Sequence, residues 1–226
     1  MRSAAVALVM MAGLVLPVGA DEATEAVRPD HPVSLFNGKD LSGWKPYLSD
    51  AKADPAKVWT VQDGVLHCSG VPAGYIRTEK TYRDYRLVVE YRWPGKGGNS
   101  GVLLHMVGND LVWPKSIESQ LMAGNAGDFY VIEGSDFAEH TDPSDRRVPN
   151  KTDDSEKELG QWNTMEILCD GDTITVFVNG EEVNKATKAN ITGGHICLQS
   201  EGTPIEFRRV ELLPLKQEDA SEKKTP

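Results

Sequence analysis

The sequence predicts an all-β fold of the antiparallel β-sandwich or jelly-roll type, on three observations. About a dozen short stretches have the apolar–polar alternation of strands, and turn residues (Gly, Asn, Asp) separate them at regular intervals. No stretch sustains an amphipathic helix of useful length. Two packed sheets bury both inner faces in one core and leave an outer face free for a site.

The N-terminal residues 1–20 have the pattern of a secretory signal peptide. A basic start, Met1-Arg2, precedes an apolar run over 4–16, and small residues end at Ala20. This run is too short for a membrane span. We therefore expect cleavage near Ala20 and a periplasmic or secreted location.

The remaining 206 of 226 residues suffice for one domain, which we place at 33–215. Residues 21–32 are polar and contain proline, so we expect a flexible lead-in. The charged residues 216–226 are expected to form a disordered tail.

Strand patterns follow one another along the first half of the domain. A hairpin is indicated at 58–68 by the turn residues Asp63-Gly64, and the longest pattern stops at Pro94-Gly95. The expected strands are 33–36, 58–61, 65–68, 75–78 and 84–93.

The second half continues the series. Asn179-Gly180 is a strong signal for a type I′ hairpin turn. Residues 135–160 are charged and without period, so we expect a long surface loop, either a binding loop or a solvated insertion. The expected strands are 97–105, 116–121, 127–133, 162–169, 173–178, 181–183, 194–200 and 205–213.

The net charge and the cysteines limit the classes of partner and cofactor that the protein is expected to bind. The net charge of −10 argues against nucleic-acid and anionic-membrane partners and is compatible with a neutral small molecule such as a carbohydrate. Cys68, Cys169 and Cys197 match no metal motif and no disulfide framework, which favours buried free thiols. The sequence carries no signal for the oligomeric state.

Two neighbouring strand patterns carry the candidate catalytic residues. Side chains alternate between faces along a strand, so Asn99 and His105 share one parity, and Glu118 and Gln120 share another. If the strands lie side by side, a base (His105), a carboxylate (Glu118) and an amide (Gln120) share one polar face. These three are the catalytic candidates.

Further polar and aromatic residues are candidates for substrate binding. The charged and amide residues have the parity of wet faces, and the two tryptophans lie at strand ends where a sugar ring could stack. Each candidate also has a purely structural interpretation. The polar residues could simply face solvent, Asn99 could shape a turn, and His105 could be a hydrogen-bonded histidine of the core. The candidates are Asn99, Glu90, Arg92, Trp93, Trp113, Gln199, Glu201 and Arg208.

A divalent metal ion is an alternative way of polarising a substrate. His105 with Glu118 and Glu90 would supply nitrogen and oxygen ligands. No compact ligand motif supports this set, so no cofactor is assigned.

Several short motifs follow one another along nearly the whole mature chain. They are Leu35-Phe36-Asn37-Gly38-Lys39-Asp40-Leu41-Ser42-Gly43-Trp44, Trp59-Thr60-Val61-Gln62-Asp63-Gly64, Asn99-Ser100-Gly101-Val102, Glu118-Ser119-Gln120, Gly160-Gln161-Trp162-Asn163 and Gln199-Ser200-Glu201-Gly202. In this order they resemble the bacterial family of 3-keto-disaccharide hydrolases, once known only as a domain of unknown function.

This resemblance implies a concanavalin A-like lectin/glucanase fold and action on 3-keto-glycosides. A ketone at C3 acidifies the C2 hydrogen, so a base can start elimination at C1–C2, and hydration then completes glycoside cleavage. Two other functions stay open. One is a non-catalytic, lectin-like glycan-binding module, and the other is a conventional glucanase with two carboxylates, Glu118 with Glu90 or Glu201.

Overall fold

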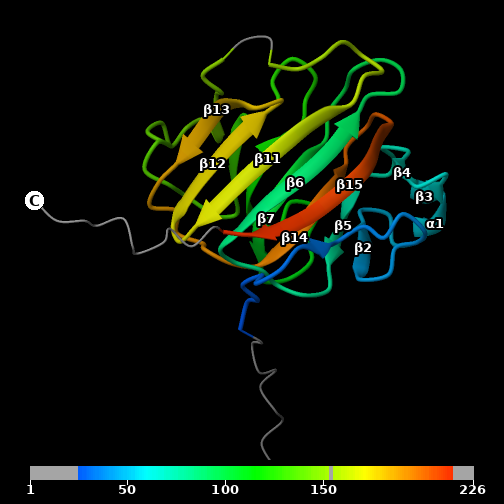
Figure 1. The fold of residues 1–226 in the computed structure, drawn as a ribbon, viewed down its shortest axis with the longest axis horizontal. Helices are drawn as coiled ribbons and strands as arrows, with labels where there is room; N and C mark the ends of the chain where they lie inside the picture. The colour runs from blue at the N-terminus through cyan, green and yellow to red at the C-terminus, as the bar shows by residue number, and fades with distance from the viewer. Residues whose placement is uncertain (1–24, 153–154, 216–226) are drawn as a thin grey trace, which may run out of the picture.

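Two antiparallel sheets, packed face to face, make up nearly the whole structure and confirm the predicted sandwich. The computed structural model describes residues 25–152 and 155–215. The expected signal peptide and C-terminal tail lie outside these ranges. In Figure 1, strands of one sheet lie in front and β7 and β14 of the other lie behind them.

The sheet in front has eight strands, and β6 and β15 lie at its centre. In spatial order the strands are β13 (Glu181–Ala186), β12 (Thr173–Val178), β11 (Asn163–Asp170), β6 (Tyr85–Arg92), β15 (Ile205–Pro214), β4 (Val65–Cys68) and β3 (Trp59–Gln62), with β1 (Val33–Ser34) paired to β15.

The second sheet has seven strands, with β7 at its centre. The one helix in the described ranges, α1 (Pro55–Val58), precedes β3 and is capped by Asp54. In spatial order the strands of this sheet are β10 (Arg147–Val148), β9 (Phe129–Ile132), β8 (Lys115–Gln120), β7 (Gly101–Val107), β14 (His195–Ser200), β5 (Gly74–Thr78) and β2 (Trp44–Leu48).

Alternation along each strand builds the core between the sheets. In β6, Tyr85, Leu87, Val89 and Tyr91 are fully buried and belong to the main apolar cluster, while the residues between them include charged ones. Burial of this apolar surface is the dominant driving force of folding. The same pattern leaves the outer face of each sheet for other side chains.

The predicted hairpins are confirmed. β3 and β4 pair with Gln62 opposite Val65. Asn179 and Gly180 both have positive φ, 51° and 90°, as a type I′ turn between β12 and β13 requires. The local turn signal therefore fixed this connection.

The structure also bears on the predicted lead-in, the predicted loop 135–160 and the cysteines. Residues 21–32 were expected to be a flexible lead-in; in the described part of this segment, 25–32, the Val27 N–H donates to the Thr81 carbonyl (2.9 Å) and Arg28 forms a 2.6 Å ion pair with Asp84. The expected loop 135–160 contains the short strand β10. The three cysteines are buried free thiols, as predicted. No helix in the described ranges is long and apolar enough to span a membrane.

Candidate functional site

The outer face of the seven-stranded sheet holds the candidate site. Along β7, Leu103 and Met106 pack into a small apolar cluster on this face, whereas Val102 and Leu104 belong to the core between the sheets. Leu103 is paired with Glu118 of β8. Paired residues point to the same side of a sheet, so Glu118 shares the outer face with Leu103.

Gly101 makes room for two polar side chains on this face. A Cβ atom at this position would lie 2.3 Å from Oε1 of Glu118 and 2.3 Å from Oε1 of Gln199. Gln199 belongs to β14, the neighbour of β7 on the side away from β8. Carboxyl and amide therefore converge over a glycine from the two flanking strands.

Asn99 and Glu201 extend this group beyond the strand ends. An isolated antiparallel bridge pairs Asn99, which precedes β7, with Glu201, which follows β14. Both residues are partly buried. We call Asn99, Gly101, Glu118, Gln199 and Glu201 the carboxyl–amide cluster.

Unpartnered polar atoms concentrate in the carboxyl–amide cluster. In the described ranges, nine buried side-chain nitrogen or oxygen atoms have no hydrogen-bond partner. Four of them belong to this cluster: Oδ1 of Asn99, Oε1 of Glu118, and Oε1 and Nε2 of Gln199. An unsatisfied buried polar group costs about 1–3 kcal/mol, so such a concentration indicates a site built to receive a polar ligand.

Burial also changes the acidity of the two carboxyl groups. Burial, reinforced by the nearby Glu201, raises the pKa of Glu118 to about 8, and Arg146 opposes this rise. Burial raises the pKa of Glu201 to about 7, against the effects of Asn99 and Arg146. Both groups therefore exchange protons near neutral pH, which suits acid–base catalysis.

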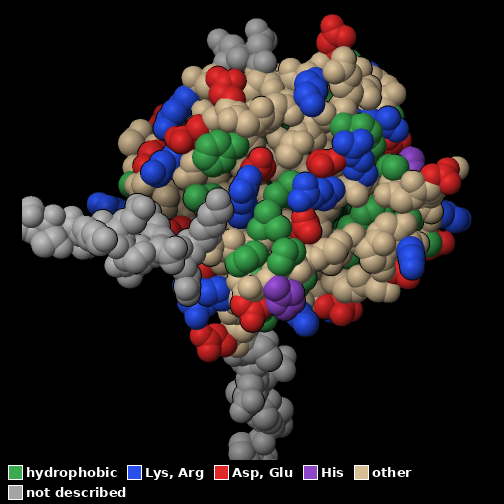
Figure 2. Space-filling view, viewed as in Figure 1, with side chains coloured by type: hydrophobic (Ala, Val, Ile, Leu, Met, Phe, Trp, Pro, Cys, Tyr) green, Lys and Arg blue, Asp and Glu red, His purple; other side chains and the backbone are tan. Residues whose placement is uncertain are grey.

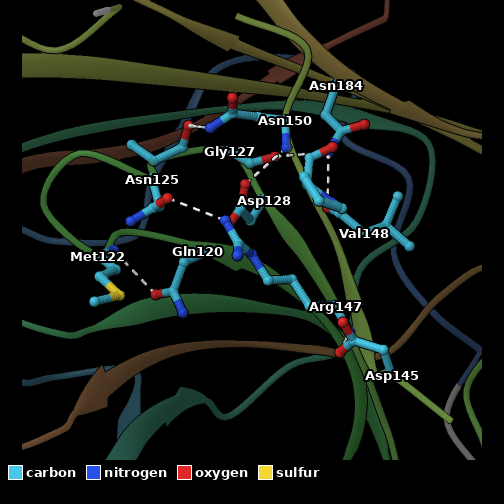
Figure 3. Close-up of polar contacts among 12 residues, drawn as sticks. Gln120, Met122, Asn125, Gly127, Asp128, Asp145, Arg147, Val148, Asn150 and Asn184 are labelled. Atoms are coloured by element: carbon cyan, nitrogen blue, oxygen red, sulfur yellow. Dashed lines mark hydrogen bonds and ion pairs between the residues drawn. The ribbon is translucent and has the colours of Figure 1, made fainter. Parts of the chain in front are cut away.

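A network at the edge of the sheet holds the segment that carries Arg146. Asp128 is 1% exposed and forms a 2.6 Å ion pair with Arg147, the first residue of β10. Its other oxygen accepts the N–H of Asn150 at 2.7 Å, and Arg147 also donates to Asn125. Figure 3 shows these contacts surrounding Arg147. They fix the segment that carries Arg146, whose positive charge acts on Glu118.

Gln120 lies beside this network and has a different role from the one predicted. Its pairing partner is Gly101, so it is close to the carboxyl–amide cluster. Its Oε1, however, accepts the N–H group of Leu121 at 2.9 Å. The same oxygen accepts the N–H group of Met122 at 3.0 Å (Figure 3). In this structure Gln120 therefore shapes the turn after β8.

His105 does not share the outer face with Glu118, and the prediction from parity is wrong. A β-bulge lies between Leu104 and Val107, and His105 has a φ of 54°. The ring consequently points into the core, where it packs edge-on against Tyr85 at 5.7 Å and donates from Nδ1 to the Ile191 carbonyl at 3.2 Å. Burial lowers the pKa of His105 to about 4, so it is neutral at pH 7.

Glu90, Arg92 and Arg208 lie on the outer face of the other sheet, away from the carboxyl–amide cluster. Each is already paired: Arg208 with Glu90, and Arg92 with Glu206 at 2.5 Å. Both guanidinium groups also lie over the ring of Trp162, at 4.6 and 4.5 Å. Figure 2 shows charges of both signs interspersed over this face. Parity alone could not say to which sheet these residues belong.

The two predicted stacking residues differ in exposure. Trp93 is 2% exposed and belongs to the core, so it offers no sugar platform. Trp113 is 41% exposed, on the loop between β7 and β8. Asp110 of the same loop is held by Arg77 at 2.7 Å and by the Tyr75 hydroxyl at 3.0 Å. Trp113 lies beyond the pair Val107 and Lys115, whereas Gly101 and Gln120 pair at the other end of β7 and β8, so the structure does not bring Trp113 to the carboxyl–amide cluster.

The metal alternative does not fit the geometry. His105 faces the core, Glu90 lies on the opposite sheet, and only Glu118 is in the carboxyl–amide cluster. Among the residues of known placement, no group of three or more His, Cys, Asp or Glu side chains could hold a metal ion.

Sequence reasoning missed Tyr130 and Arg146. Tyr130 of β9 is paired with Glu118, and Arg146 precedes β10. Alternation over the expected strand 127–133 would have set Tyr130 on the face opposite to Phe129 and Val131. No local signal could have found Arg146, because its place depends on the pairing of β10 with β9.

Comparison with known proteins decides the family. The model of the 3-keto-alpha-glucoside-1,2-lyase-like domain matches residues 31–213, which include every strand of both sheets except the last residue of β15. The chain belongs to this family. This confirms the resemblance found in the sequence.

The proteins similar to this 3-keto-alpha-glucoside-1,2-lyase-like domain include one sequence relative and two solved structures that share its fold. A 3-keto-disaccharide hydrolase from Bacteroides thetaiotaomicron is 26% identical over 200 residues, which cover 76% of this chain and 61% of the relative. A crystal structure of a candidate glycosyl hydrolase from Parabacteroides distasonis has a TM-score of 0.61 at 24% identity, covering 81% of this chain and 99% of the other. A β-glucanase from Bacillus licheniformis has a TM-score of 0.54 at 14% identity, covering 80% and 97%.

Proposed function

We propose that this protein is an exported enzyme that cleaves 3-keto-glycosides by elimination at C1–C2 followed by hydration. The observation that carries the proposal is the carboxyl–amide cluster, in which Glu118 and Glu201 exchange protons near neutral pH beside unpartnered amide atoms. Family membership and the relative that is named a 3-keto-disaccharide hydrolase support the substrate class.

Glu201 is assigned as the base. The carbonyl at C3 makes the C2 hydrogen acidic, and a carboxylate with a pKa near the working pH removes it most effectively. A pKa of about 7 keeps a large fraction of Glu201 ionised at neutral pH, and its position at the end of β14 is partly open to solvent. The electron pair of the C2–H bond then forms the enolate of the C3 ketone.

Glu118 is assigned as the hydrogen-bond donor to the enolate oxygen. With a pKa of about 8 it stays mostly protonated at pH 7, and a neutral carboxylic acid can donate where a carboxylate can only accept. The Gln199 amide, whose Nε2 has no partner, supplies a second donor over Gly101. Donors that are fixed in place before the charge develops lower the barrier more than any other single effect in many enzymes.

Collapse of the enolate reforms the C3 ketone, creates the C1=C2 bond and expels the C1 substituent. Water then adds its hydroxyl group to C1, its other proton balances the one taken up by the departing oxygen, and the protonated Glu201 returns its proton to C2. The net reaction is hydrolysis of the glycosidic bond, and the ketone is unchanged.

The test is turnover of a 3-keto-glucoside by the mature protein and by two variants, Glu118→Leu and Glu201→Gln. Both variants should lose about 100-fold or more in kcat, because leucine cannot donate to the enolate oxygen and glutamine cannot take the C2 proton. Glu90→Gln, on the opposite sheet, is the matched control and should retain activity. Full activity in both site variants would overturn the proposal, and a parallel measurement with EDTA tests metal dependence.

A conventional glucanase is the second candidate, because the same two carboxyl groups could act on an unoxidised glycan. It predicts cleavage of unoxidised polysaccharide and no need for the ketone. A lectin-like module predicts glycan binding with no product. Assays with oxidised and unoxidised substrates separate all three.

Export rests on the N-terminal pattern at 1–20. N-terminal sequencing of the mature protein should begin close to Asp21, and cell fractionation should find it outside the cytoplasm. An intact Met1 in the mature protein would contradict export.

A further inference from the structure

Tyr130 occupies a place beside Glu118 that the proposed chemistry does not use. In the antiparallel pairing of β8 with β9, Tyr130 lies opposite Glu118, and on its other side it lies opposite Arg147 of β10. Opposed residues have Cβ atoms about 4.5–5.5 Å apart and share a face. Phe129 and Val131 point into the core, so Tyr130 points to the outer face with Glu118.

The surroundings of Tyr130 are fixed, and its ring is partly open to solvent. Arg147, its cross-strand neighbour, is held by Asp128 and Asn125 (Figure 3). The phenol is half-buried, whereas Glu118 is 5% exposed. Tyr130 therefore lies at the rim of the carboxyl–amide cluster, where the departing half of a glycoside can leave toward water.

The phenol is protonated under working conditions. Burial raises the pKa of Tyr130 above its ordinary value near 10, and the positive charge of Arg147 opposes part of this rise. A group that must donate a proton at neutral pH has to carry that proton beforehand.

We propose that Tyr130 is the general acid that protonates the glycosidic oxygen as the C1 substituent leaves. This inference rests on the proposed function, in which Glu201 takes the C2 proton and Glu118 binds the ketone oxygen. Neither is then free to serve the leaving group. Tyr130 is the cross-strand partner of Glu118 and faces the same side from the open edge of the site.

The proton balance of the two half-reactions closes with this assignment. In the elimination, the C1–O bond breaks with its electron pair on oxygen, and the Tyr130 hydroxyl gives its proton to that oxygen. In the hydration, water forms the new C1–O bond and gives one proton to the Tyr130 phenolate. Each turnover therefore returns both Tyr130 and Glu201 to their starting states.

The test compares Tyr130→Phe on two substrates that differ in leaving group. A methyl 3-keto-glucoside has a poor leaving group that needs protonation, and a 4-nitrophenyl 3-keto-glucoside has a good one that does not. The variant should lose about 100-fold in kcat/KM on the methyl substrate and less than about 3-fold on the nitrophenyl substrate. Tyr47→Phe, on β2 of the same sheet and stacked on Tyr75, is the matched control and should change neither rate.

Three results would overturn the assignment. Equal losses on both substrates would mean that Tyr130 binds or shapes the site without donating a proton. Unchanged rates on both substrates would exclude any role. If the wild-type protein cleaves neither substrate, the proposed function fails and the Tyr130 assignment fails with it. Thermal unfolding of the variant, expected within about 2 °C of wild type, separates these outcomes from misfolding.

Discussion

Glu118 and Gln199 place side-chain oxygens over the same glycine, Gly101, each 2.3 Å from the point that a Cβ atom would occupy. The two oxygens are therefore no farther apart than twice this distance. The two residues are more than eighty positions apart in the sequence, on strands that flank β7. Their convergence depends on the absence of a side chain between them.

The first prediction is that Gly101→Ala lowers activity and leaves the fold intact. Gly101 does not have a positive φ, so alanine causes no backbone strain. The new methyl group would collide with the ends of two flexible side chains and displace both. We expect kcat/KM on a 3-keto-glucoside to fall at least about 10-fold, and the free energy of unfolding to change by less than about 1 kcal/mol. Gly95→Ala, where a Cβ atom meets nothing within 4 Å, is the control.

The second prediction concerns the pH dependence of stability. Glu118 has a folded-state pKa of about 8, raised by burial, against an ordinary value of 4.5. The folded state therefore binds the proton more tightly than the unfolded state. Its stabilising contribution is complete below pH 4.5 and is lost as pH rises from 4.5 through 8. Each pKa unit corresponds to about 1.4 kcal/mol.

The free energy of unfolding of Glu118→Gln should accordingly fall less than that of the wild type between about pH 5 and about pH 9. Urea unfolding of both proteins at several pH values measures these free energies, and the variant should become more stable relative to the wild type as pH rises. Parallel curves for the two proteins would show that Glu118 titrates normally. This measurement needs no substrate.

The third prediction separates His105 from catalysis. His105→Asn keeps a residue that tolerates positive φ but loses the ring contact with Tyr85 and leaves space in the core. We expect a loss of about 1–3 kcal/mol in the free energy of unfolding, with kcat within about twofold of wild type. A large fall in kcat with unchanged stability would restore the catalytic role predicted from the sequence.

The fourth prediction tests the network around Asp128. Asp128→Asn removes the negative charge that pairs with Arg147. It also places an amide NH₂ group, which cannot accept a hydrogen bond, against the donors Arg147 or the Asn150 N–H. Because Arg147 is 37% exposed, water screens part of the effect, and we expect a loss of about 1–3 kcal/mol by chemical denaturation. Glu211→Gln, which breaks the more exposed pair with Arg209, should cost less than about 1 kcal/mol. Equal effects would mean that the network adds nothing to the edge of the sheet.

Two kinds of sequence signal predicted correct structure. Alternation over 84–93 gave the inner and outer faces of β6, because side chains of a strand point alternately to its two sides. Asn179-Gly180 gave its hairpin, because both residues accept positive φ. Both are local properties, carried by consecutive residues. Asn99, Glu118, Gln199 and Glu201 were each named as candidates because they are polar residues on such strands, but the sequence did not group them.

The incorrect placements of site residues have one physical cause. The alternation of side chains along one strand does not predict which distant strand pairs with it, or in which register. The bulge in β7 turned His105 into the core, because a bulge shifts the parity of every residue after it. Glu90, Arg92 and Arg208 belong to β6 and β15 of the eight-stranded sheet, so they lie on the opposite face of the sandwich. Local alternation was enough to predict a sandwich of strands with polar residues at its surface. Which of these residues meet over Gly101 depends on the register of β14, β7, β8 and β9, and that register is set by contacts between strands that are distant in the sequence.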